Sequence, residues 1–122
     1  MGRPALAKRP GAGDNRRNPS VPVPMLLDDI RELLAAPAPA LDRVDATLTA
    51  GYAQALQLEA ERWRLERGIG EVAAELSDDP SEPRHEELAS LARRLTSVNE
   101  DINRLRKLLA SLRERRSEFQ AA

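Results

Sequence analysis

The sequence predicts an all-α protein in which a short helix precedes a long antiparallel coiled-coil hairpin that dimerises. Two runs, residues 41–76 and 88–119, repeat an apolar residue every three or four positions, which is typical of a coiled-coil seam. A segment rich in proline and acidic residues separates them. The first ladder is Leu41, Val44, Leu48, Gly51, Ala55, Leu58, Arg62, Leu65, Ile69, Val72 and Leu76; the second is Leu88, Leu91, Leu95, Val98, Ile102, Leu105, Leu109, Leu112 and Phe119, with a break at Arg116.

The first 24 residues are expected to be a disordered basic leader. They carry Arg3, Lys8, Arg9, Arg16 and Arg17 against one acid, Asp14, and are rich in proline and glycine. Such a segment buries too little apolar surface to fold. A basic tail can bind nucleic acid weakly by charge, but this one lacks aromatic residues, so we do not expect nucleic acid as the main partner.

Residues 25–36 are predicted to form a short amphipathic helix that ends before Pro37 and Pro39. A helix of this length is marginal in water, so its leucine face must dock on something. Packing on the chain's own hairpin is the favoured interpretation, and a partner's groove is the alternative. In that alternative Leu27, Ile30 and Leu34 bind the partner.

Residues 41–119 are predicted to form the hairpin, with its turn at residues 77–84. Pro80 and Pro83 lie in this turn among Ser and Asp residues, and Pro83 suits an early position of the following helix. A short connection makes neighbouring helices antiparallel. The basic end of the last helix then meets Asp42 and Asp45 at the start of the preceding one.

One seam leaves apolar area uncovered at the flanks of a two-helix hairpin, so association is expected. Tyr52 and Trp63 are candidate anchors, because interface hot spots favour Tyr, Trp and Arg. A second copy or another protein would both cover these flanks, and periodicity does not distinguish them.

Composition argues against catalysis and against a metal centre. The chain has no cysteine, one histidine (His85) and 2% aromatic residues, while 32% of its residues are charged. Soft or imidazole metal ligands are therefore scarce, and the paired acids suit helix starts and turns better than acid–base chemistry. No apolar run approaches the roughly 20 residues that span a bilayer. We expect a cytoplasmic non-enzyme that requires no cofactor and contacts no membrane.

A polar stripe on the last predicted helix offers a more specific hypothesis. Glu86, Ser90, Arg93, Ser97 and Asp101 recur at helical spacing off the leucine ladder, over about 22 Å, on the side expected to face away from the seam. Arginine can stack on a purine or bind its O6 and N7 edge, carboxylates accept from N1 and N2, and hydroxyls reach phosphate or ribose. The stripe therefore suits a guanine nucleotide, although a coiled coil also needs a solvated polar face.

This stripe resembles the motif Glu-x3-Ser-x2-Arg-x3-Gln-x3-Asp of the actinobacterial anti-sigma factors that bind cyclic di-GMP on a helical hairpin. Four of the five positions match, and Ser97 stands at the glutamine position. The preceding long helix carries no comparable copy, so a site built from two motif faces would require a dimer. The resemblance implies a regulator that sequesters a sigma factor, with cyclic di-GMP as its regulatory ligand.

The sequence thus leaves three functions open. The first is a non-catalytic coiled-coil adaptor or regulatory binding protein, and the second is the cyclic di-GMP-responsive anti-sigma regulator. The third is weak nucleic-acid binding through the basic segments.

Overall fold

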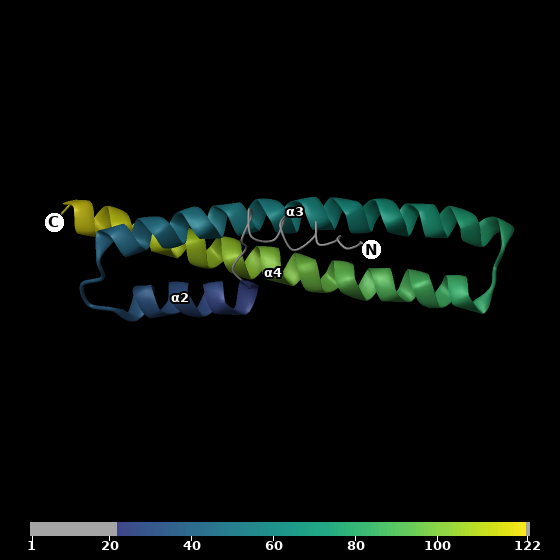
Figure 1. The fold of residues 1–122 in the computed structure, drawn as a ribbon, viewed down its shortest axis with the longest axis horizontal. Coiled ribbons are helices and arrows are strands. Elements are labelled where there is room, and N and C mark those ends of the chain that lie inside the picture. Colours follow the sequence, from purple (N-terminus) through teal and green to yellow (C-terminus); the bar gives the residue numbers. More distant parts are fainter. Residues whose placement is uncertain (1–21, 122) are drawn as a thin grey trace, which may run out of the picture.

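The computed structural model describes residues 22–121 of the 122-residue chain and contains three helices there. They are α2 (Val23–Ala35), α3 (Leu41–Asp78) and α4 (Glu82–Ala121). No strand occurs among the described residues, so the predicted all-α class is confirmed. Figure 1 shows α3 and α4 side by side along their length, with α2 beside the half that lies farther from the α3–α4 connection. Within residues 22–121, no helix combines the length and apolarity needed to cross a membrane.

The helix ends differ by a few residues from those predicted. α2 begins at Val23 rather than residue 25, because Pro24 lies in the first turn, where its missing N–H costs nothing. Only residues 79–81 connect α3 to α4, in place of the turn predicted over 77–84. Of the leader expected over residues 1–24, residues 1–21 lie outside the described part of the chain.

Ser81 accounts for the early start of α4. Its Oγ accepts a hydrogen bond from the backbone N–H of Arg84 at 3.4 Å, the interaction of a helix N-cap. Pro83 then occupies the second helical position, where it disrupts no intrahelical bond. The Arg84 guanidinium also lies 2.7 Å from Glu75 at the end of α3, and so links the two helices across the turn.

The seam between α3 and α4 uses the ladders that the sequence predicts. On α3 the buried ladder positions run from Val44 to Leu65, with Val72 beyond, and on α4 they run from Val98 to Leu112. The ladder is thinner near the turn, where Leu88, Leu91 and Leu95 are only half-buried. The α3–α4 pair is therefore best packed in the half that α2 joins.

Gly51 of α3 packs against Leu109 of α4. A Cβ built on Gly51 would overlap Leu109 Cδ2 and lie 3.2 Å from Leu109 Cγ, and Leu109 is only 2% exposed. The missing side chain at position 51 is therefore the space that Leu109 fills. Nothing lies within 4 Å of a Cβ built on Gly70, which is exposed.

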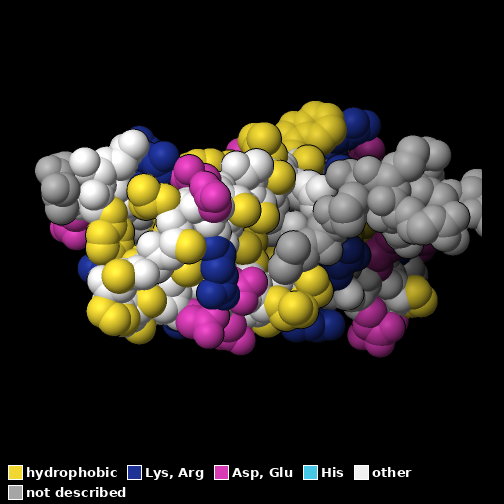
Figure 2. Space-filling model, turned by 60° about the vertical axis from the view of Figure 1, so that its left-hand side comes forward, with side chains coloured by type: hydrophobic (Ala, Val, Ile, Leu, Met, Phe, Trp, Pro, Cys, Tyr) yellow, Lys and Arg dark blue, Asp and Glu magenta, His cyan; other side chains and the backbone are white. Residues whose placement is uncertain are grey.

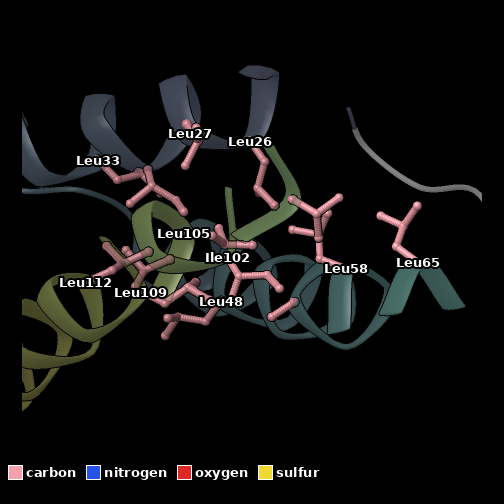
Figure 3. Close-up of a cluster of buried hydrophobic side chains, with 14 residues drawn as sticks. Leu26, Leu27, Leu33, Leu48, Leu58, Leu65, Ile102, Leu105, Leu109 and Leu112 are labelled. Carbon is pink, nitrogen blue, oxygen red and sulfur yellow. The ribbon is translucent and has the colours of Figure 1, made fainter. Parts of the chain in front are cut away.

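α2 packs its leucine face onto this well-packed half. Leu26, Leu27, Ile30 and Leu33 are each at most 5% exposed and join one cluster with seam residues of α3 and α4. Figure 3 shows Leu26, Leu27 and Leu33 above Ile102 and Leu105 of α4. Burying four such side chains stabilises the docked helix by several kcal/mol, at about 1.5–3 kcal/mol each.

Polar contacts hold the end of the bundle where α2 meets α3. The Arg115 guanidinium donates to the carbonyl oxygen of Ala36 at 2.6 Å and stacks on the Phe119 ring, 4.9 Å from its centroid. Arg43 on α3 binds Glu32 on α2 at 2.8 Å. These contacts tie the connection between α2 and α3 to α4.

Arg116, which breaks the second ladder, forms a two-pronged contact with Asp45. Its Nε donates to one carboxylate oxygen, and its Nη2 donates to the other at 3.1 Å. The hydrogen bond from Arg116 lowers the pKa of Asp45 below its ordinary value of 3.8. Arg116, which interrupts the apolar ladder of α4, therefore links the end of α4 to the start of α3.

Replacing Gly51 and Gly70 by alanine tests the close approach. Alanine at an exposed helical glycine raises the free energy of unfolding by about 1 kcal/mol, so Gly70→Ala should stabilise. Overpacking against Leu109 should make Gly51→Ala less stable than Gly70→Ala by about 1–3 kcal/mol. Urea unfolding followed by circular dichroism measures both, and equal stabilisation would show that Leu109 does not require the space.

The Asp45–Arg116 contact predicts a pH-dependent loss of stability. Because the pKa of Asp45 is lower in the folded state, its contribution is full above about pH 4 and disappears as the pH falls through the folded pKa. Asp45→Asn should therefore be less stable than wild type at neutral pH, and this difference should shrink as the pH falls through the folded pKa of Asp45. Asp29→Asn, which removes a carboxylate without such a contact, is the control; the same pH profile in both variants would contradict the prediction.

Candidate functional site

Three large hydrophobic side chains lie exposed on one side of α3. Tyr52, Leu56 and Trp63 are 42%, 68% and 57% exposed. Their spacings of four and seven residues place them in one row, called here the α3 stripe. Trp63 also carries the Arg67 guanidinium, 5.0 Å above its ring centroid. Figure 2 shows hydrophobic atoms reaching the surface among basic and acidic side chains.

A groove between α3 and α4 adjoins the stripe. Its volume is about 440 Å³ and no residue of α2 lines it. Buried Ala55 and Leu109 contribute apolar surface, and charged side chains border it. Arg106 is paired with Glu59 across the groove, whereas Arg113 makes no ion pair with the described residues. The lining residues are Tyr52, Ala55, Leu56, Glu59, Arg106, Leu109, Ala110 and Arg113.

The structure separates the predicted partner-binding residues into two groups. Tyr52 and Trp63 are exposed, in the α3 stripe. Leu27 and Ile30 are 5% and 0% exposed, and half-buried Leu34 packs against the same core. The partner-binding alternative is therefore corrected for Leu27 and Ile30, because α3 and α4 already cover these two side chains.

The five polar-stripe residues of α4 do not share one environment. Glu86, Ser90, Arg93 and Ser97 are exposed, whereas Asp101 is half-buried and lies 3.6 Å from Arg104. Ser97 and Asp101 border a second groove of about 400 Å³ at the N-terminal end of α2. This groove is also lined by Val23, Pro24, Gln54, Leu58, Glu61, Arg94 and Val98.

The position of the second groove shows that the polar stripe of α4 is oriented differently from the prediction. Ser97 and Asp101 lie at the edge of the seam beside α3 and α2 rather than on a side facing away from it. Glu86, Ser90 and Arg93 do not line this groove and lie nearer the turn. Within one chain, the five side chains therefore form a polar strip along α4 that reaches the start of α2.

The charge next to the second groove is partly balanced. Arg94 lies 3.8 Å from Glu61 across the seam, and both border the groove. Arg93 is exposed and makes no ion pair with the described residues. Within the described part of the chain, no three His, Cys, Asp or Glu side chains are grouped to hold a metal ion.

Comparison of this chain with protein-family models, with curated proteins and with solved structures gave no match. Its candidate sites are therefore interpreted from their residues and geometry alone.

Sequence reasoning placed Tyr52 and Trp63 correctly on the surface but overlooked the groove beside them. Leu56, Arg106 and Arg113 were not predicted as site residues. The signal for the row was present, because Tyr52, Leu56 and Trp63 share a second helical face. The position of Arg106 and Arg113 beside this row depends on how α4 packs against α3, which the spacing along one helix does not specify.

Proposed function

We propose that this chain is a non-catalytic module that binds protein through the α3 stripe and its adjoining groove. In this proposal the antiparallel coiled-coil hairpin is a stiff support, and the exposed row of Tyr52, Leu56 and Trp63 is the binding surface. The row itself is the main support: three large hydrophobic side chains, each at least 42% exposed, follow one another on one helix. Aromatic and aliphatic anchors beside an apolar groove are typical of helix-in-groove recognition.

The distribution of burial supports this choice of surface. α2 uses its own leucine face within the chain, so that face is not free for another protein. The α3 stripe has no such cover among the described residues. Exposing this apolar surface to water is energetically unfavourable. Arginines beside the groove would add charged contacts at the rim of an interface.

Photo-crosslinking in the cells that produce this protein tests the surface. Benzoylphenylalanine at position 63 should form discrete covalent adducts with protein, whereas the same group at Met25, which is 58% exposed on α2, should form none. The mass of the adduct distinguishes a second copy from another protein. No adduct at position 63, or the same adducts at both positions, would contradict the proposal.

A second function, regulation by cyclic di-GMP of a module that sequesters a sigma factor, has separate support. The resemblance of the α4 strip to the anti-sigma motif is joined by the exposure of Glu86, Ser90 and Arg93. Because Leu27 and Ile30 are buried, the sigma factor would bind the exposed flanks of the hairpin rather than the leucines of α2. Ser97, shorter than the motif's glutamine, would contribute a hydroxyl at the groove beside α2.

Calorimetric titration with cyclic di-GMP tests this second function. Wild type should bind saturably, and Arg93→Ala should weaken binding at least about tenfold, because it removes the cation that stacks on or pairs with guanine. Arg64→Ala, which removes an exposed arginine of α3, is the control and should bind as wild type does. Absence of heat from wild type, or equal loss in both variants, would overturn the assignment.

A further inference from the structure

The α3 stripe has a pattern that is complementary to itself in the reverse direction. Positions equally far from the midpoint between Glu59 and Ala60 pair Leu56 with Trp63, Tyr52 with Arg67 and Thr49 with Gly70. All six residues are exposed and lie along one side of the helix. A two-fold axis through that midpoint would bring each residue of one copy opposite its mate on the other.

We propose that the occupant of the α3 stripe is a second copy of this chain, with the two α3 helices antiparallel across the two-fold axis. This inference rests on the proposed function, which makes the stripe a protein-binding surface, and it names the partner. The resulting dimer is isologous, so every contact occurs twice.

The apolar contacts at the centre favour this arrangement. Leu56 and Trp63 are 68% and 57% exposed, and each would cover the other across the axis. Tyr52 would meet Arg67, whose guanidinium already lies 5.0 Å from the Trp63 centroid. Arg67 would then lie between two aromatic rings, an arrangement that cation–π attraction stabilises.

Side-chain size also matches toward the ends of the row. Gly70 has no side chain, and a Cβ built there meets nothing within 4 Å. Its mate is Thr49, an exposed residue of the preceding half of the helix. Two helices therefore approach closely at both ends of the row without a clash between large side chains.

Charge complementarity at the groove supplies an independent argument. Leu109 lies over Gly51 and Arg116 binds Asp45, so Arg113 lies beside α3 between these two residues. The two-fold axis places that part of α3 opposite Glu71 of the second copy. Glu71 lies at one edge of the α3 stripe. In the two-fold dimer, this edge faces α4 of the other chain. Arg113 makes no ion pair with the described residues of its own chain, and Glu71 pairs only loosely with Arg67, at 3.7 Å.

The mass of the full chain in solution tests the dimer. Light scattering should give twice the 13.5 kDa of one chain, and Leu56→Glu should give the monomer mass. Met25→Glu places the same charge on an exposed apolar residue of α2 and should leave the dimer intact. Circular dichroism should show equal helix content in all three proteins, so that loss of the dimer is not loss of the fold.

Charge reversal then identifies the register. Arg113→Glu alone and Glu71→Arg alone should each weaken the dimer about tenfold or more, because like charges meet twice in each homodimer. A mixture of the two variants should form a heterodimer of near wild-type affinity, since both of its contacts again pair opposite charges. Recovery on mixing would support this two-fold arrangement, and failure to recover would overturn it.

The outcomes separate this inference from the proposed function. A monomeric wild type that still crosslinks another protein at position 63 overturns the second-copy assignment and leaves the protein-binding surface intact. A dimer unaffected by Leu56→Glu also overturns the assignment, because the contact would then lie elsewhere. A dimer lost in Leu56→Glu and retained in Met25→Glu supports it.

Discussion

The contact of Leu109 with the bare backbone of Gly51 sets how closely the two long helices pack. A helix pair has one seam, and its stability depends on side chains of each helix filling the spaces of the other. At this point α3 has no side chain, and the buried side chain of Leu109 occupies the space where a Cβ would lie. The contact brings the flanks of the two helices together, and Leu109 also lines the groove beside the α3 stripe. A stabilising contact and a candidate binding surface therefore share one residue.

The hydrophobic core is thicker in one half of the α3–α4 pair than in the other. Near the start of α3 and the end of α4, α2 adds a third helix to the core, and Arg115, Arg116 and Arg43 bind across the helices. Near the turn, only the two-helix seam remains, Leu88, Leu91 and Leu95 are half-buried, and α3 carries Gly68 and Gly70. Local opening costs least where few apolar contacts are buried. We therefore expect the turn half to exchange its amide protons before the half that α2 covers.

Two surfaces of different chemistry follow from this arrangement. The groove beside the α3 stripe is apolar at its base and bordered by arginines, and α2 contributes nothing to it. The groove at the start of α2 is lined by both polar and apolar side chains, and it includes Ser97 and Asp101 of the polar strip of α4. Because different residues line the two grooves, a protein partner and a small anionic ligand would not compete for the same side chains. Coupling between them would have to pass through the shared seam, where Leu58 lines one groove and Ala55, one turn earlier, lines the other.

The sequence by itself determined the helical elements of this protein, because the evidence for each of them is local. Apolar spacing predicted the three helices, Pro37 and Pro39 marked the end of the first, and Pro83 suited an early position of the last. Which neighbour covers a given face is a non-local question, and only the tertiary structure decided it. Folding decided between the two alternatives for Leu27 and Ile30 by burying them within the chain, paired Arg116 with Asp45 in particular, and brought Ser97 and Asp101 to the start of α2. The tertiary structure also placed Arg113 beside Tyr52. The helical repeat shows which residues share a face of one helix, but it does not show which other helix packs against that face.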